Sequence, residues 1–243
     1  MINTDYQQDD GFVNVASSIL SNLSTDAIFS ATMKAKNKNT ANTWQQRTPF
    51  QQFTDLFPGD LAKNVVADYL NVIQSIVTVN YDKVRTDGFK YNDQYDLLLG
   101  QDKIEVKSSL EKQLQNPKAI KNNRRIIIYS ELQGISAYIF QVYYLTKNSS
   151  STFCNDLERL KEDELKTKYS ISSEADFARV FENEVNAYIM AYTDRAQAEI
   201  YKRERRFFTF GAPRQGETKR QYLDLYLRDC YSPETFQKHI VKL

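Results

Sequence analysis

The segment 94–107 alternates polar and apolar residues on either side of Gly100-Gln101. Two alternating runs separated by two residues, with Gly first, predict a β-hairpin closed by a type II′ turn. Such a turn places Leu99 opposite Asp102. A shift of one residue would carry the charged side chains of the hairpin into the core, so the alternation fixes the register. No other segment constrains the fold as strongly.

One face of this hairpin carries the groups of obvious chemical use. The register places Asp96 opposite Glu105, with Cβ atoms roughly 4.5–5.5 Å apart. Lys107 lies two residues beyond Glu105 and therefore shares their face. The other face is expected to pack on the core, and it carries Tyr95, Leu97, Leu99, Ile104 and Val106.

Two carboxylates and an amine on one sheet face are what a metal-dependent phosphodiesterase needs. Carboxylate oxygens hold hard divalent cations, and the lysine stays near the attacking water and the scissile phosphate. The alternative is a solvated hairpin face with a cross-strand ion pair that has no chemical role.

The composition excludes several other kinds of site. The two cysteines, Cys154 and Cys230, have no metal-ligand spacing, which argues against a zinc site or a disulfide framework and fits a reducing cytoplasm. The single histidine, His239, excludes mechanisms that need two. The N-terminus has no signal pattern, and no apolar run approaches about 18 residues, so we expect a soluble, cytoplasmic protein without a membrane segment.

Apolar periodicity predicts the remaining elements. One or two short helices are expected within 11–33, a polar arm within 34–49, and a helix from Leu61 after a break at Pro58-Gly59. Strands are expected at 76–80, 125–129 and 137–145, and 108–119 is compatible with a helix. After a Ser-rich break at 148–152, a Ser173…Asp176 capping pair begins a helix whose apolar residues repeat from Phe177 to Ala196.

These elements predict an α/β fold with a central mixed β-sheet flanked by helices. We divide the chain of 243 residues into three parts. They are an N-terminal helical segment with a polar arm at 1–55, a catalytic core at 56–147, and a mainly helical C-terminal region at 148–243 that packs on the core.

Two basic segments are candidates for DNA contacts, although the net charge is only +1. Residues 34–47 contain no acid, and 195–220 hold eight basic residues against three glutamates. The candidates in the first segment are Lys34, Lys36, Lys38 and Arg47. Those in the second are Arg203 and Arg206 for phosphates, and Arg214, Gln215, Lys219, Arg220 and Gln221 for base edges. The alternative is that these are ordinary solvated helix faces and polar loops.

The order helix, strand, Asp-bearing strand, Glu-x-Lys strand, helix, strand resembles the core of the PD-(D/E)XK nuclease superfamily, over about residues 58–145. The match rests on Asp96, Glu105 and Lys107, and the size of the chain resembles that of type II restriction endonucleases. Tyr95 stands where the family often has proline. Many members also carry a glutamate on the preceding helix, and Asp60 falls at that place; it is either that carboxylate or a helix N-cap.

The resemblance implies a restriction-endonuclease-like fold and Mg²⁺-dependent hydrolysis of double-stranded DNA by a homodimer. Asp96, Glu105 and the carbonyl of Val106 would hold the metal ion, and Lys107 would orient a water or stabilise charge on the phosphate. Ser108 would contact the DNA backbone or cap the next helix. A nuclease of the same core directed at DNA structure, in repair or mobile-element transfer, and a non-catalytic DNA-binding protein remain alternatives.

Overall fold

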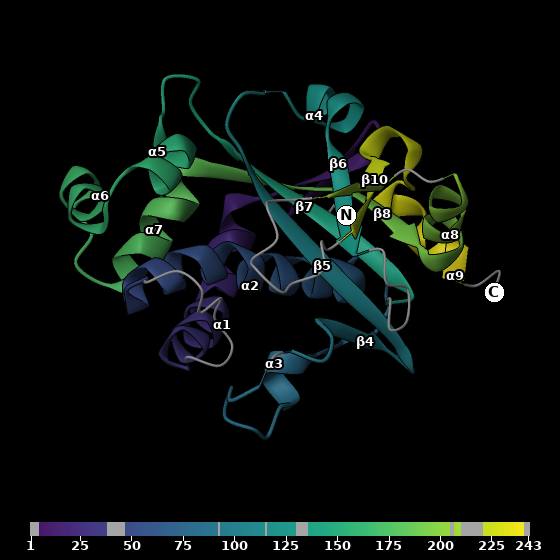
Figure 1. The fold of residues 1–243 in the computed structure, drawn as a ribbon, viewed down its shortest axis with the longest axis horizontal. Helices are drawn as coiled ribbons and strands as arrows, with labels where there is room; N and C mark the ends of the chain where they lie inside the picture. The colour runs from purple at the N-terminus through teal and green to yellow at the C-terminus, as the bar shows by residue number, and fades with distance from the viewer. Residues whose placement is uncertain are drawn as a thin grey trace.

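The computed structural model describes residues 5–37, 47–91, 93–114, 116–129, 136–204, 207–209 and 221–240. In this part of the chain a seven-stranded mixed sheet has the order β1-β2-β8-β7-β5-β4-β3, and a three-stranded sheet has the order β6-β10-β9 (Figure 1). The strands are β1 (Tyr6–Asp9), β2 (Phe12–Val15), β3 (Val79–Asn80), β4 (Leu97–Leu99), β5 (Asp102–Glu111), β6 (Arg125–Tyr129), β7 (Tyr138–Thr146), β8 (Val185–Asp194), β9 (Phe207–Thr209) and β10 (Gln221–Tyr226).

Helices pack on the large sheet, so the predicted α/β class with a mixed central sheet is confirmed. The helices are α1 (Ser17–Lys36), α2 (Pro49–Val72), α3 (Tyr81–Val84), α4 (Pro117–Asn123), α5 (Phe153–Arg159), α6 (Glu162–Tyr169), α7 (Glu174–Glu184), α8 (Arg195–Arg203) and α9 (Phe236–Ile240). Within the described residues, no helix is both long and apolar enough to cross a membrane.

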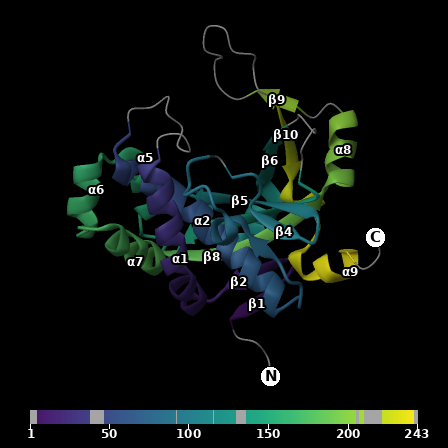
Figure 2. The same cartoon turned by 90° about the horizontal axis from the view of Figure 1, so that it is seen from below.

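The large sheet separates two hydrophobic cores. Helices α1, α2 and α7 cover one face, and the small sheet lies on the other side (Figure 2). Alternate residues of β5 point to opposite faces of the sheet, and Ile104 and Val106 belong to the core beneath α2. The strand β7 runs parallel to β5, and the remaining pairs of the large sheet are antiparallel. The sheet includes β1, β2 and β8, so all three predicted parts of the chain contribute strands to it.

The predicted hairpin is confirmed. β4 pairs with β5 with Leu99 opposite Asp102 and Leu97 opposite Ile104. Gly100 has a φ of 60°, the left-handed value that the first position of a type II′ turn requires and that glycine adopts without steric cost. The register that was read from the turn is therefore the register of the structure.

Helix α2 is longer than predicted, since it begins at Pro49 and continues through Pro58-Gly59. Thr48 caps it by accepting a hydrogen bond from the backbone N–H of Gln51, whose side chain accepts one from the Thr48 N–H in return. The predicted break at Pro58 is wrong because burial against the sheet outweighs the lost helix bond. The carbonyl of Pro58 accepts a hydrogen bond of 2.9 Å from the Tyr144 hydroxyl of β7.

Three further element predictions are wrong. The strand β2 precedes the first helix, and β5 continues to Glu111 through the segment that looked helical. The predicted helix after Ser173 ends at Glu184, and 185–194 form β8. β8 lies between β7 and β2 with most of its side chains buried, so its apolar residues fit a helical spacing as well as a strand. The predicted strands at 125–129 and 137–145 are confirmed, as is the Ser173 cap.

We predict that Phe57→Ala lowers the free energy of unfolding by about 3–5 kcal/mol, because the ring is fully buried and its loss leaves a cavity. Phe57 packs against Phe53, Phe177 and Phe181 and so anchors α2 to α7. The measurement is guanidinium unfolding followed by circular dichroism. Val77→Ala is the control: that side chain is 81% exposed, and we expect a change of about 0.5 kcal/mol or less.

Candidate metal centre

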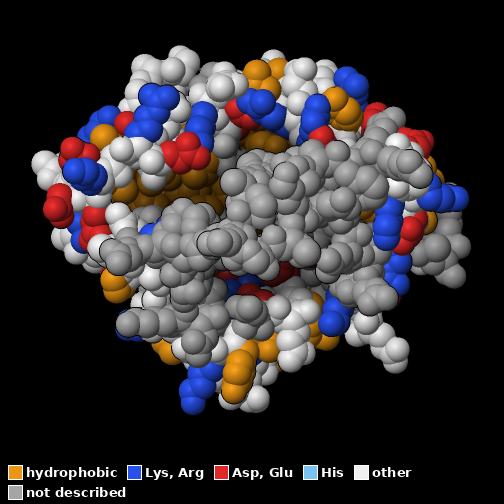
Figure 3. Space-filling view, in the orientation of Figure 1, with side chains coloured by type: hydrophobic (Ala, Val, Ile, Leu, Met, Phe, Trp, Pro, Cys, Tyr) orange, Lys and Arg blue, Asp and Glu red, His pale blue; other side chains and the backbone are white. Residues whose placement is uncertain are grey.

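A cavity of about 270 Å³ lies between α2 and the start of the hairpin. Its charged lining comes from α1, α2 and the segment before β4, and Val106 of β5 forms part of its wall. Figure 3, drawn from the side of Figure 1, shows acidic and basic side chains deep in a hollow near the middle of this face. The charged residues that line the cavity are Lys34, Asp55, Asp60, Lys63, Asp93 and Asp96.

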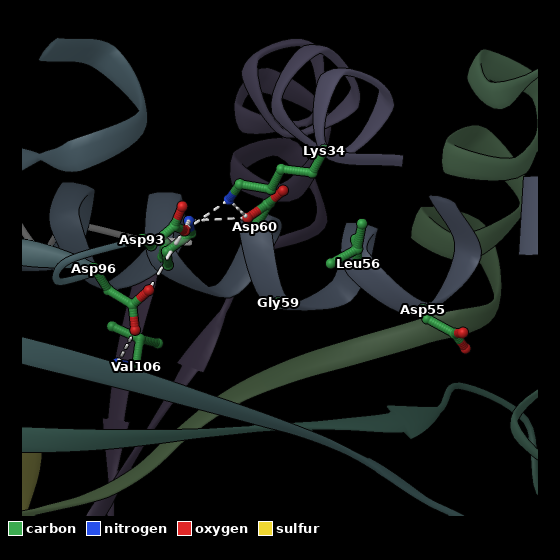
Figure 4. A pocket seen from close by; sticks show the side chains of 9 residues that line it. Lys34, Asp55, Leu56, Gly59, Asp60, Asp93, Asp96 and Val106 are labelled. Atoms are coloured by element: carbon green, nitrogen blue, oxygen red, sulfur yellow. Dashed lines mark hydrogen bonds and ion pairs between the residues drawn. The ribbon is translucent and has the colours of Figure 1, made fainter. Parts of the chain in front are cut away.

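Asp96 immediately precedes β4 and lies where the hairpin strands separate. Its Oδ2 accepts a hydrogen bond of 2.7 Å from the backbone N–H of Val106. Its own carbonyl accepts one of 3.1 Å from the N–H of Tyr81. The Asp96 carboxylate therefore accepts the hydrogen bond that a backbone carbonyl would accept if the β4–β5 ladder continued. It turns into the cavity beside Val106 (Figure 4).

Glu105 and Lys107 flank this point on β5. Their side chains form an ion pair with each other and are about one-third exposed, at 36% and 31%. They lie on the face of β5 opposite Ile104 and Val106, since successive residues of a strand alternate. The predicted sharing of a face thus holds for Glu105 and Lys107 and is wrong for Asp96, whose carboxylate accepts the Val106 N–H and lines the cavity on the Val106 side.

Three buried or partly buried carboxylates next to Asp96 form a cluster that we call the aspartate triangle: Asp60, Asp82 and Asp93. One oxygen from each lies within 4.8 Å of the others, which is compatible with a metal site. In this structure the ammonium groups of Lys34 and Lys63 each lie within 3.1 Å of all three carboxylates. Arg85 adds contacts of 3.3 Å to Asp82 and 2.7 Å to Asp93.

The surroundings raise the pKa values of both Asp96 and Lys63, for different reasons. Burial raises the pKa of Asp96 to about 6, although Lys63 and the Val106 N–H lower it and Glu105 raises it. The Lys63 ammonium is 3.9 Å from the Asp96 carboxylate, farther than from any carboxylate of the triangle. Burial lowers the pKa of Lys63, but the surrounding aspartates raise it well above its usual value. Asp96 is thus the least compensated of these carboxylates.

Asp60 is not a helix N-cap, because α2 begins eleven residues earlier and Thr48 caps it. Its Oδ1 belongs to the contacts with Lys34 and Lys63. Its Oδ2 is buried and has no hydrogen-bond partner among the residues that the structure describes. Asp60 therefore lines the same cavity as Asp96 with one carboxylate oxygen still able to accept a ligand.

Two other predicted DNA contacts lie elsewhere than expected. The Lys34 side chain is only 5% exposed and is engaged with the aspartate triangle, so it is not available to DNA in this structure. Ser108 is within β5 and does not cap a helix. It lies against α2 at Gly59, where a Cβ added to the glycine would be 3.8 Å from the Ser108 hydroxyl.

The structure describes only some of the remaining residues that were predicted to contact DNA. Lys36 and Arg203 are exposed, and Arg47 forms an ion pair of 2.5 Å with Asp55. Gln221 begins β10, and its side chain lies outside the described part of the structure. The other candidates lie outside the described residues: Lys38, Arg206, Arg214, Gln215, Lys219 and Arg220.

Sequence reasoning missed Lys63, Asp82, Arg85 and Asp93. One signal was available, because aspartates are dense in 82–96, directly before the hairpin. The i,i+3 spacing of Asp60 and Lys63 places both on one side of α2. Nothing in the sequence pairs that helix face with the aspartates, since the contacts form only in the tertiary structure.

Searches against protein-family models, curated proteins and solved structures found no match for this chain.

We predict that Asp96→Asn stabilises the metal-free protein at pH 8 by up to about 3 kcal/mol. A carboxyl whose pKa is raised by folding favours the folded state when protonated, so its ionisation costs stability as the pH rises from about 4 to about 6. Asparagine removes that cost and can still accept the Val106 hydrogen bond. The advantage of the variant should therefore narrow as the pH is lowered from 8 towards 4.

The measurement is chemical unfolding of both proteins in EDTA at several pH values. Asp102→Asn, at an exposed position in the same hairpin, is the matched control and should change stability little at any pH. An Asp96→Asn variant that is less stable than the parent at pH 8 would contradict the account of Asp96.

Proposed function

We propose that this chain is a Mg²⁺-dependent endonuclease that cleaves double-stranded DNA, with Asp96, Glu105 and Lys107 as its catalytic residues. One observation carries the proposal. Asp96 turns a mostly buried, poorly compensated carboxylate into a cavity beside Val106, the residue between Glu105 and Lys107 in β5. If Glu105 and Lys107 formed only a structural ion pair, they would not need a third charged group, because Lys107 already has Glu105 as its partner.

The order of elements supports a PD-(D/E)XK core. Helix α2 is followed by β3, the short α3, the β4–β5 hairpin, α4, β6 of the small sheet and then β7, which is parallel to β5. Apart from α3 and β6, this is the order of elements on which the resemblance rests. The added strands β1, β2 and β8 extend the sheet on the side of β7 away from the hairpin.

The donors around Asp96 fit a hard divalent cation. They are carboxylate oxygens and a backbone carbonyl, which Mg²⁺ prefers. The buried Oδ2 of Asp60, without a hydrogen-bond partner among the described residues, is a further oxygen that lines the same cavity. The ion would be held by Asp96, Glu105 and the Val106 carbonyl, with Asp60 as a further ligand.

When bound, Mg²⁺ supplies a Lewis acid that neutralises charge on the phosphate and lowers the pKa of a bound water. The chain supplies the positions. The Val106 N–H holds the Asp96 carboxylate in one orientation, and the Lys107 ammonium forms an ion pair with Glu105. In the proposed reaction Lys107 would hydrogen-bond the attacking water or stabilise charge that develops on the phosphate oxygens.

The proposed partner is double-stranded DNA bound by a homodimer, because cutting both strands of a palindrome requires two sites related by a twofold axis. Lys36, Arg47 and Arg203 are the described basic residues that we propose for contacts with phosphates. A nuclease directed at DNA structure has the same chemistry and a different product pattern. Digestion of plasmid DNA separates the two, since discrete bands indicate sequence specificity and nicks or smears indicate a structural target.

We predict that Lys107→Ala reduces Mg²⁺-dependent plasmid cleavage by at least about 100-fold and leaves DNA binding largely in place, because Lys107 acts on the transition state. Cleavage is followed on gels, and binding by the fluorescence anisotropy of a labelled duplex. Asp96→Ala and Glu105→Ala should likewise abolish cleavage.

Lys103→Ala is the matched control, since Lys103 is an exposed lysine on the same face of β5. Its cleavage rate should remain within a few-fold of the parent. Undiminished cleavage by both Lys107→Ala and Asp96→Ala would disprove the site assignment.

A further inference from the structure

The aspartate triangle has the geometry of a metal site and yet contains two lysines. Asp60, Asp82 and Asp93 come from α2, from α3 and from the segment before β4, and their carboxylates converge within 4.8 Å. An acidic cluster of this kind repels itself unless cations lie within it. What fills the triangle therefore determines how many metal ions the centre takes.

Both ammonium groups contact the same three oxygen atoms. Lys34 Nζ lies 2.7, 2.7 and 2.9 Å from Asp60 Oδ1, Asp82 Oδ2 and Asp93 Oδ2. Lys63 Nζ lies 2.9, 2.5 and 3.1 Å from those atoms. An ammonium group has three N–H donors, so each lysine has one carboxylate oxygen for every proton that it carries. Figure 4 shows Lys34 and Asp60 pointing toward each other at the edge of the cavity.

Each carboxylate of the triangle is compensated by nearby cations. All three contact both ammonium groups, and Asp82 and Asp93 also contact Arg85, which forms a further ion pair with Asp87. The side chains of Lys34, Lys63 and Arg85 are at most 5% exposed, so water screens these charges poorly. A divalent ion added to the triangle would meet two ammonium groups at close range, and it could enter only by displacing them.

We propose that Lys34 and Lys63 take the place of a second divalent cation in the aspartate triangle, so that the centre binds one metal ion, at Asp96. The number of ions at Asp96 rests on the nuclease function proposed above. The exclusion of metal from the triangle depends only on the contacts of the two lysines. Lys34 and Lys63 are thus positioning residues, which hold the triangle and the Asp60 carboxylate in place beside Asp96.

The test counts bound Mn²⁺ by electron paramagnetic resonance at concentrations that saturate the parent protein. The parent should bind one ion per chain, and Asp96→Asn should bind none. Adding Lys34→Met and Lys63→Met to Asp96→Asn should create a site for one ion, because the triangle then presents three carboxylates without an ammonium group, with only Arg85 beside Asp82 and Asp93. That variant should also gain thermal stability on addition of Mn²⁺. The matched control adds Lys36→Met and Lys83→Met, at exposed lysines, to Asp96→Asn, and it should bind no ion.

The outcomes separate the two proposals. Two ions in the parent, or one ion retained by Asp96→Asn, would overturn the proposal that lysines exclude metal from the triangle. So would a folded Lys34→Met, Lys63→Met, Asp96→Asn protein that binds no ion. No ion in the parent, together with one in that variant, would contradict the proposed nuclease function and support the role of the lysines. If the Lys34→Met, Lys63→Met, Asp96→Asn protein folds only in the presence of Mn²⁺, that requirement supports the proposal that the lysines exclude metal from the triangle.

Discussion

The buried ion pairs of Lys34 and Lys63 with three aspartates are the interaction on which the candidate site depends. They join α1, α2, α3 and the segment that leads into the hairpin, elements that are distant in the sequence. Burying charges is costly unless each is paired, and removing one partner of such a set leaves another uncompensated. The position of α2 relative to β4 and β5 therefore depends on every charged residue of the cluster.

Asp96 is the exception among these carboxylates. Each carboxylate of the triangle has two ammonium groups within 3.1 Å, whereas Asp96 has a backbone N–H at 2.7 Å and an ammonium only at 3.9 Å. A carboxylate kept in such surroundings costs stability unless a ligand compensates it. We propose that a cation provides this compensation at Asp96, next to a cluster that already has its cations.

The sequence predicted what depends on local chemistry. Gly100 and the alternation around it gave the hairpin and its register, and Ser173 gave the start of α7. It could not predict the helix through Pro58 or the strand β8, because in both cases burial against the sheet decides between conformations that the residues allow. Lys34 looked like a DNA contact because its neighbours are basic, and only the tertiary structure brings it to three aspartates.

The most direct measurement of the central claim is an anomalous difference map from crystals of this protein soaked in Mn²⁺. The account predicts one strong peak within coordination distance of the Asp96 and Glu105 carboxylates, with the Lys34 and Lys63 ammonium groups still inside the aspartate triangle. A peak at the centre of that triangle, or a saturated soak with no density at Asp96, would contradict it.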